Sequence, residues 1–388
     1  MTLDAEGNSS VTLDFTSGDQ SDVSQDVASN LTEPPGDAPL AFQPMVAAYV
    51  VPVLFGIIFV VGVVGNGTLI FAVIRNKKMR NVPNIYILSL AIGDLLLILT
   101  SVPISATLYS FTIWPFGEPF CQFNHFMQTL SLGVSVFTLT ALSGDRYTVI
   151  VNPMSKHTGN PTFRTFAVAI GIWVISAILA IPDLLSSEVY RHQEKNNTRA
   201  PFIPICDLYR KDWPIWYPKF HVMFRFCVYF AIPVVIIGFF YVMMAHMLLL
   251  SGNTIPGDGD MKQHKQRQIE AREKVAKVVL SFVVIFVICW FPRHIYLIWY
   301  HYDPSGFNTF WHVFKITAYC FCFINSCVNP MALYFLSRQF RRLYNNYLFC
   351  LCIQDQYSRM DQSTMHKFSS TVRRTSTSMT IVQSQSMC

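Results

Sequence analysis

Polar side chains inside apolar stretches are the first candidates for chemistry in this sequence. Asp94 stands within an apolar run, and five uncharged polar residues occupy other apolar runs: Asn66, Ser135, Asn325, Ser326 and Asn329. A carboxylate in an apolar interior must be protonated, paired or bound to a cation, and no Lys or Arg lies at matching depth. We expect these groups to converge on Asp94, where their oxygens suit a small hard cation such as sodium. The alternative is a structural hydrogen-bonded cluster without an ion.

A second candidate is the run Asp145-Arg146-Tyr147, which ends another apolar stretch 24 to 26 residues after Cys121. The guanidinium of Arg146 is permanently charged, so it can pair with Asp145 in a resting state. It can instead donate to backbone carbonyls of an inserted partner helix. The tripeptide alone carries little information. Its place at the edge of an apolar stretch, before a loop that contains Pro153, indicates a partner-binding site.

Apolar helices must position these residues. Hydrophobic residues make up 52% of the 388 residues and charged residues only 13%, about half the share in ordinary soluble domains. A membrane-spanning helix needs about 20 mostly apolar residues. Seven stretches meet that requirement: 45–74, 83–108, 118–150, 164–185, 217–250, 272–300 and 309–335. The sequence therefore predicts an all-α membrane protein, a seven-transmembrane helix bundle with a short amphipathic cytoplasmic helix after the seventh span.

The connecting loops predict the orientation in the membrane. Basic clusters fall in alternate connections, at residues 75–80, 262–277 and 338–342, whereas the opposite short loops carry little charge beyond Glu118 and Asp303. The positive-inside rule therefore places the N-terminus outside and the C-terminus in the cytoplasm, in a multi-pass protein of the plasma membrane.

Four parts of the chain are expected. They are an extracellular, disordered and glycosylated arm at 1–44, the bundle at 45–336, an amphipathic membrane-surface helix at 337–352 and a disordered Ser/Thr-rich cytoplasmic tail at 353–388. The arm carries eight acidic residues and no Lys or Arg, and it lacks the basic and apolar regions of a signal peptide.

Covalent modification sites follow from this topology. Cys121 and Cys206 both face the oxidising side, so a disulfide is their natural pairing, with two free thiols as the alternative. Three glycosylation sequons fall outside: Asn8, Asn30 and Asn196. Two juxtamembrane cysteines are palmitoylation candidates, with plain thiols as the alternative: Cys350 and Cys352.

Landmarks in every span resemble the rhodopsin-like family of G-protein-coupled receptors over about residues 45–350. They are Gly65-Asn66, Asp94, Cys121 with Asp145-Arg146-Tyr147, Trp173, Pro233, Tyr241, Cys289-Trp290-Phe291-Pro292 and Asn329-Pro330. The resemblance implies an extracellular ligand and nucleotide exchange on a heterotrimeric G protein. It implies a switch below the ligand, formed by Trp290, Phe286, Pro233, Asn329 and Pro330. It also implies a transducer surface at Asp145, Arg146, Tyr147 and Tyr241.

Two departures from the family pattern affect the inner side. Leu333 takes the place where the family commonly has a tyrosine after Asn329-Pro330, so no role is carried over to Tyr334. Arg272 stands where many members keep an acid that holds Arg146, although Glu270 and Glu273 flank it. An ionic lock between helices is therefore not expected, and a high resting activity is conceivable.

The sequence argues against an amine and against retinal as the ligand. Amine receptors of the family keep an aspartate where Gln128 stands, and visual pigments keep a lysine where this chain has residues 322–324. The outer half offers six candidate peptide contacts: Gln128, His125, Arg293, His294, Lys315 and Tyr319. Trp216, Trp299 and Trp311 lie nearer the rim. Arg293 is expected to take an acidic group or a peptide carbonyl, and the alternative is an internal pair with Asp207 or Asp212.

Several runs of the sequence resemble one branch of the family. Gln128, Trp114-Pro115-Phe116-Gly117, Cys289 to His294 and the run after Asn329 are similar to the bombesin and gastrin-releasing-peptide receptors, among them the arthropod CCHamide-type receptors. This resemblance implies a neuropeptide ligand and coupling through Gq and calcium. A phosphorylated tail would bind an arrestin-like basic partner.

Other functions are weaker readings of the same sequence. The alternatives are an orphan or lipid-sensing receptor and a seven-helix transporter. A transporter needs a continuous path of ionisable residues, and the spans offer essentially Asp94 alone. No catalytic constellation supports an enzyme, and no cofactor is expected beyond an allosteric sodium ion.

Overall fold

The structure is a computed structural model that describes residues 42–76, 79–111, 113–151, 160–192, 202–252, 259–303 and 308–348. The expected glycosylation sites Asn8, Asn30 and Asn196 lie outside the described residues, as do the palmitoylation candidates Cys350 and Cys352. The described residues divide into two compact units, with the division between Ala332 and Leu333.

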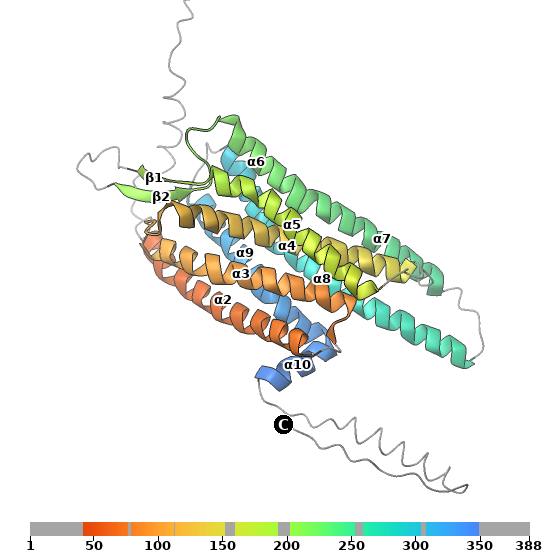
Figure 1. Ribbon diagram of the computed structural model, residues 1–388. Coiled ribbons are helices and arrows are strands. Elements are labelled where there is room, and N and C mark those ends of the chain that lie inside the picture. The colour runs from red at the N-terminus through yellow and green to blue at the C-terminus, as the bar shows by residue number, and fades with distance from the viewer. Residues whose placement is uncertain are drawn as a thin grey trace, which may run out of the picture. The chain divides into compact units, whose positions relative to one another are not determined.

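Long helices make up the first unit (Figure 1). They are α2 (Phe42–Arg75), α3 (Val82–Phe111), α4 (Gly117–Val151), α5 (Pro161–Ser186), α6 (Trp216–Phe226), α7 (Ile232–Gly252), α8 (Gly259–Tyr302) and most of α9 (Thr309–Leu336). A π-helical turn at Cys227–Ala231 joins α6 to α7, so the two form one span. Seven described helices are long and apolar enough to cross a membrane, which confirms the predicted seven-helix fold.

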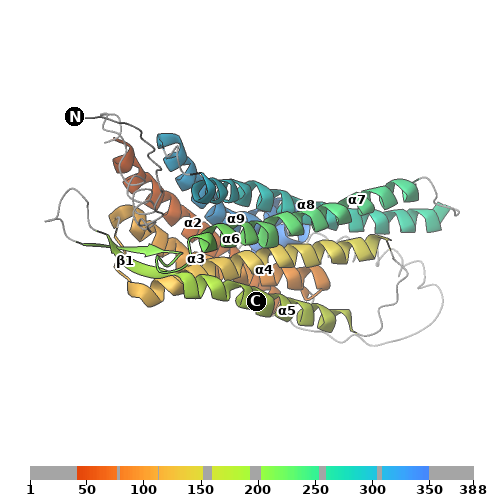
Figure 2. The same ribbon diagram turned by 90° about the horizontal axis from the view of Figure 1, so that it is seen from above.

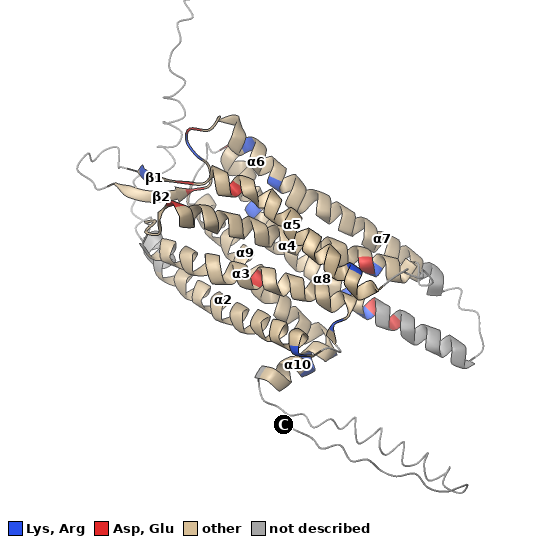
Figure 3. Cartoon of the chain, in the orientation of Figure 1, with Lys and Arg blue, Asp and Glu red and all other residues tan. Residues whose placement is uncertain are grey.

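The distribution of side chains explains why these helices form a bundle in lipid. Charged residues are sparse along the middle of the helices (Figure 3). Many large apolar side chains of α2, α5 and α7 remain exposed, as expected for surfaces that face hydrocarbon. Buried polar groups point inward instead: Asn329 bonds Asp94 across helices, whereas others, such as Ser143, bond a carbonyl of their own helix. The apolar faces therefore meet lipid, and the polar residues concentrate between helices.

Helix α4 is the central element, because it is the most buried of the seven spans and contacts α3, α5, α7 and α8. Its closeness to α5 depends on Gly133. A Cβ atom at that position would lie 2.9 Å from Ser176 Oγ and 3.0 Å from Ser176 Cβ, closer than side chains normally pack. Glycine therefore permits an approach of the two helices that any larger residue would prevent.

A β-hairpin covers one end of the bundle, as Figure 2 shows. Strands β1 (Glu188–His192) and β2 (Ile203–Asp207) pair antiparallel, with Val189 opposite Cys206. The disulfide between Cys121 and Cys206 ties β2 to the start of α4, which confirms the predicted bridge. The hairpin is thus fixed to the central helix.

One helix boundary and one backbone irregularity differ from the apolar stretches in the sequence. Helix α8 begins at Gly259, well before the apolar stretch expected from residue 272. Its first turns are rich in Lys, Gln, Arg and Glu, which favour helix in water, so the helix continues past the lipid boundary. The π-helical turn precedes Pro233, which has no N–H to donate to the preceding turn.

The second unit contains the last residues of α9 and the helix α10 (Arg338–Leu348). This helix lies within the stretch where the sequence predicts an amphipathic helix. It carries the basic residues Arg338, Arg341 and Arg342, and Tyr344 contacts the ring of Tyr334 with centroids 6.3 Å apart.

Candidate functional site

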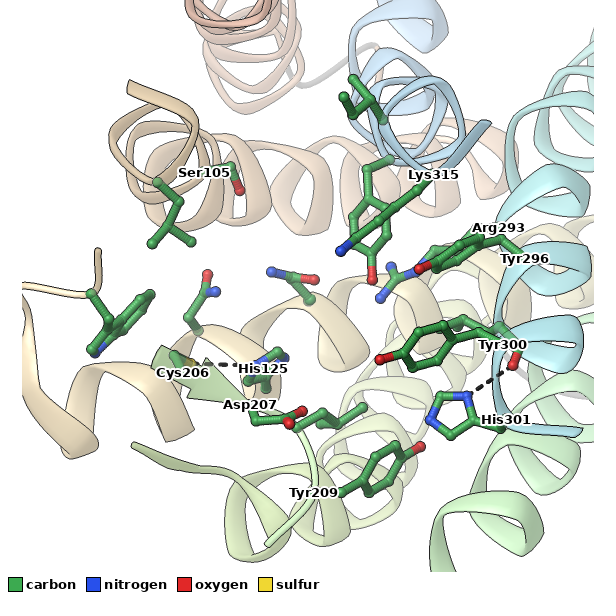
Figure 4. A pocket seen from close by; sticks show the side chains of 18 of the residues that line it. Ser105, His125, Cys206, Asp207, Tyr209, Arg293, Tyr296, Tyr300, His301 and Lys315 are labelled. Atoms are coloured by element: carbon green, nitrogen blue, oxygen red, sulfur yellow. Dashed lines mark hydrogen bonds between the residues drawn. The ribbon is translucent and has the colours of Figure 1, made fainter. Parts of the chain in front are cut away.

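A cavity of about 390 Å³ opens among α3, α4, α8, α9 and the segment that begins in β2 (Figure 4). Its lining combines aromatic, basic and amide side chains, with one carboxylate, Asp207. Such a mixture of apolar walls and a few polar groups is typical of ligand-binding sites.

Five of the six predicted ligand contacts line this cavity: Gln128, His125, Arg293, Lys315 and Tyr319. The sixth, His294, lies outside the lining and packs against Phe226 and Phe230, with ring centroids 5.7 and 5.0 Å away. Neighbouring residues on a helix point about 100° apart, so Arg293 and His294 face different neighbours. The rim residues Trp299 and Trp311 are not in the lining either, and their rings stack 3.7 Å apart between α8 and α9.

Arg293 is a buried charge at the inner end of the cavity, one helical turn from Trp290. Its guanidinium carbon lies 4.9 Å from the ring centroid of Tyr319 and 5.6 Å from that of Trp290. Its Nε has no hydrogen-bond partner, although the Cys322 thiol lies within reach of the guanidinium. No carboxylate of the described chain forms an ion pair with it. Internal pairing with Asp207 or Asp212 is therefore not found.

The two loop acids are engaged elsewhere. Asp212 pairs with Arg210, with Nε and Oδ1 3.1 Å apart. Asp207 accepts hydrogen bonds from the backbone N–H groups of Leu208 and Tyr209, and burial raises the pKa of its carboxyl group. Burial in the cavity wall therefore disfavours the charged form of Asp207.

Tyr209 connects the loop after β2 to two helices. Its hydroxyl lies 3.2 Å from His221 Nδ1 of α6, and its ring meets that of His301 of α8 edge-on at 5.4 Å. Burial raises the pKa of the Tyr209 phenol, so this side chain stays neutral. The same loop is also held at Lys211, whose backbone N–H donates to Glu188 Oε1 at 2.7 Å. The loop wall is held on several sides.

Cys121, His125 and Cys206 lie close enough to suggest a metal site, but their chemistry argues against one. The two sulfur atoms are bonded to each other, so neither is a thiolate ligand. His125 Nε2 lies 3.5 Å from Cys206 Sγ and lines the cavity. The cluster therefore fixes the cavity wall.

A buried ion pair between α5 and α6 was missed by sequence reasoning. Arg225 Nη1 lies 2.7 Å from Asp183 Oδ1, with 5% and 0% of the two side chains exposed. The second carboxylate oxygen of Asp183 has no hydrogen-bond partner. The prediction that Asp94 is essentially the only ionisable residue inside the bundle is therefore wrong. Both residues stand in apolar runs, where a charge is costly, so the signal was present in the sequence.

Two of the predicted switch residues, Trp290 and Phe286, pack below Arg293 of the cavity, whereas Asn329 bonds Asp94. Trp290 is buried and lies against Phe286, with ring centroids 6.1 Å apart. Phe286 also stacks on Phe230 of the π-helical turn at 6.3 Å. The turn lies just before Pro233. The irregular backbone of the α6–α7 span therefore contacts α8 at Phe286.

The Asp94 cluster forms only in part as predicted. Asn329 Nδ2 donates to Asp94 Oδ2 at 2.8 Å, and Asn66 Nδ2 donates to the Ser326 carbonyl at 2.8 Å. No hydrogen bond joins Ser135 or the buried Asn325 to Asp94 within the described chain. Asp94 Oδ1 is buried without a hydrogen-bond partner, so the carboxylate keeps one oxygen available. That oxygen and the neighbouring oxygen-bearing side chains fit a sodium ion.

The end of the bundle away from the hairpin places the predicted transducer residues near one another. Asp145 and Arg146 form an ion pair on α4, with Arg146 Nε 3.0 Å from the carboxylate. Tyr147 stacks on Phe240 of α7 at 5.3 Å. The Tyr241 hydroxyl donates to the Ala276 carbonyl of α8 at 3.1 Å. The side chain of Arg272 is not among the described groups. Helix α7 thus contacts both α4 and α8 at this end of the bundle.

Comparison with known proteins agrees with this architecture. Residues 65–334 match the model of the 7 transmembrane receptor (rhodopsin family). Over 310 residues the chain is 48% identical to the neuropeptide CCHamide-1 receptor of Drosophila melanogaster, an alignment covering 78% of this chain and 60% of the fly protein. Over 308 residues it is 38% identical to a bombesin receptor of Bombina orientalis, covering 77% and 76%.

The alignment thus spans about 60% of the length of the fly relative. The family match covers more than half of this chain and includes the spans that carry the cavity, the aromatic switch and the Asp145–Arg146 pair. The family is one of receptors rather than enzymes. The chain belongs to the rhodopsin family of seven-transmembrane receptors.

Proposed function

We propose that this protein is a plasma-membrane receptor that binds an extracellular neuropeptide and activates a heterotrimeric G protein, with Gq and calcium as its pathway. The observation that carries the proposal is the cavity, which is lined by Arg293, Lys315, Asp207 and several aromatic rings. A peptide offers the carbonyl, amide and aromatic groups that complement such walls, whereas a lipid would leave the charged side chains without partners. The two relatives are named as receptors for peptides, which supports the same ligand class.

The proposed orientation places the cavity outside the cell. The Cys121–Cys206 disulfide lies beside the cavity and persists in an oxidising compartment. Arg146 and the basic connections mark the opposite end, which the positive-inside rule assigns to the cytoplasm. The N-terminus is then extracellular and the tail cytoplasmic.

Signal transfer is proposed to run through packed aromatic and polar contacts. A ligand at Arg293 and Tyr319 would press on Trp290, which packs on Phe286. Movement of α8 would weaken the bond from Tyr241 to the Ala276 carbonyl. The guanidinium of Arg146 could then leave Asp145 and donate to carbonyl groups of a G-protein helix.

Two further partners belong to this proposal. A sodium ion at Asp94 would supply the positive charge that the buried carboxylate lacks, with Asn329 and Ser326 beside it. We expect Asp94→Asn to abolish any difference in agonist potency between sodium and choline buffers. A phosphorylated tail would bind an arrestin-like protein through its added negative charge, as the Ser/Thr-rich sequence after Cys352 suggests.

Calcium recording in transfected cells tests the receptor proposal. Cells that display the protein at their surface are exposed to the CCHamide-1 peptide and to bombesin, and intracellular calcium is recorded. A saturable response to one peptide, absent from mock-transfected cells, is the expected result. Silence toward both peptides, with surface display confirmed and G-protein activation also absent, would sink the neuropeptide assignment while leaving the family membership intact.

A further inference from the structure

Two buried arginines in the outer half of the bundle differ in their partners. Arg225 pairs with Asp183 at 2.7 Å. Arg293 is similarly buried, with 7% of its surface exposed, but no carboxylate of the described chain lies in ion-pair range. A guanidinium removed from water without a counter-charge is costly, so buried charges are normally paired. Arg225 has a structural explanation, and Arg293 has none within the described chain.

The other contacts of Arg293 do not neutralise its charge. The rings of Tyr319 and Trp290 offer cation–π attraction, and the Cys322 thiol is only a weak acceptor. Lys315 adds a second positive group to the lining. Asp207 is the one carboxylate there, and the basic side chains that act on it are His301 and Lys211. The inner end of the cavity therefore carries uncompensated positive charge and an N–H group without an acceptor.

We propose that Arg293 is a specificity-determining residue whose guanidinium receives an oxygen acceptor of the bound peptide, a carboxylate or an amide carbonyl, and excludes cationic groups from the inner end of the cavity. This inference rests on the proposed peptide-receptor function and adds the chemistry of the deepest ligand group. A planar guanidinium can give two parallel hydrogen bonds to such an oxygen group. The stack on Tyr319 holds the guanidinium plane in place for that contact.

The position of Arg293 also connects recognition to the switch. The guanidinium lies over the ring of Trp290 at 5.6 Å, so an acceptor that draws the charge away changes the surroundings of that ring. A cationic ligand group would repel Arg293 and Lys315 together. The same residue thus selects the ligand and contacts the residue that must respond to it.

A ligand-free measurement tests the structural half of the inference. The receptor is purified in lipid nanodiscs, and thermal unfolding is compared for wild type, Arg293→Gln and the matched variant Arg225→Gln. Arg225→Gln should lower the unfolding temperature, because it leaves Asp183 buried without its partner. Arg293→Gln should leave it unchanged or raise it, because an unpaired buried charge is removed. Equal losses in both variants would show that Arg293 is structural and would overturn the proposal.

A ligand measurement tests the recognition half. Potency of the CCHamide-1 peptide, or of bombesin if only bombesin activates wild type, is compared at equal surface expression. Arg293→Gln should weaken potency by about 10- to 100-fold, the effect of losing a charged hydrogen bond. Arg293→Lys should recover part of that loss, because the charge remains. Lys315→Gln should cost less, because Lys315 is more accessible to water. A change below about threefold for Arg293→Gln would overturn the proposal.

Peptide variants distinguish the two sources of the acceptor oxygen. One arm converts the C-terminal amide of the peptide to a free acid, and the other replaces each acidic side chain by its amide. The change that affects wild type but not Arg293→Gln identifies the group at the guanidinium. If every change affects both receptors equally, the acceptor is neither the C-terminal group nor an acidic side chain, and the potency of Arg293→Gln decides whether a backbone carbonyl is bound. If neither peptide activates wild type, the neuropeptide assignment fails, and the unfolding comparison still decides whether Arg293 is structural.

Discussion

Breaking the buried pair of Asp183 and Arg225 is predicted to destabilise the outer half of the bundle more than most single substitutions. The charged atoms are 2.7 Å apart, and the two side chains are 0% and 5% exposed. At a charge separation of about 4 Å and an effective dielectric constant of about 20, the attraction is roughly 4 kcal/mol. Removing one partner also leaves the other charge desolvated. We therefore expect Arg225→Met or Asp183→Asn to cost about 3–5 kcal/mol.

A double-mutant cycle isolates the pair itself. The variant that carries both Asp183→Asn and Arg225→Met should be more stable than either single variant, because no unpaired charge remains. Thermal unfolding in nanodiscs measures the three variants against wild type. The single variants should lower the apparent midpoint by on the order of 10 °C. A cycle in which the two losses simply add would refute the reasoning, because the side chains would then not stabilise each other.

Three further perturbations test other parts of the structure. Gly133→Ala should cost about 1–3 kcal/mol by forcing a methyl group against Ser176. The control Gly171→Ala meets no atom within 4 Å and should raise the unfolding temperature slightly, because alanine favours helix more than glycine does. Cys121→Ser should cost about 2–5 kcal/mol and reduce surface expression and peptide affinity, because β2 loses its tie to α4. Burial raises the pKa of Asp207, so the stability it contributes is full below the ordinary Asp pKa and is lost as pH rises through the raised value. The unfolding temperature of Asp207→Asn should lack this pH dependence. If the variant keeps the pH dependence of the wild type, Asp207 is not its source.

The fold could be predicted because lipid imposes length and apolarity on every span. The starts and ends of most helices agree with the apolar stretches to within a few residues. The start of α8 at Gly259 could not be found this way, since residues 259–271 are polar and form helix for reasons unrelated to lipid. Apolarity indicates where a helix meets hydrocarbon and not where its hydrogen bonding begins.

The candidate site could be predicted only as far as depth along each helix. Depth placed Gln128, Arg293 and Tyr319 at one level, and all three line the cavity. Rotation about the helix axis decided the rest, so His294 faces Phe226 and Phe230 although it follows Arg293 directly. Pairing across helices was also out of reach. Asp183 and Arg225 are 42 residues apart in the chain, and the residues around each do not predict its partner.

The length of α8 amplifies movement at its Gly259 end. The helix runs from Gly259 to Tyr302 and contains Pro292, where one backbone hydrogen bond is missing and bending is easiest. At about 1.5 Å per residue, Pro292 divides it into an inner arm of about 50 Å and an outer arm of about 15 Å. Each degree of bend then moves the inner tip by about 0.9 Å, roughly three times the travel of the outer tip. A ligand that displaces the short arm by the width of an atom would therefore sweep the long arm through the width of a helix.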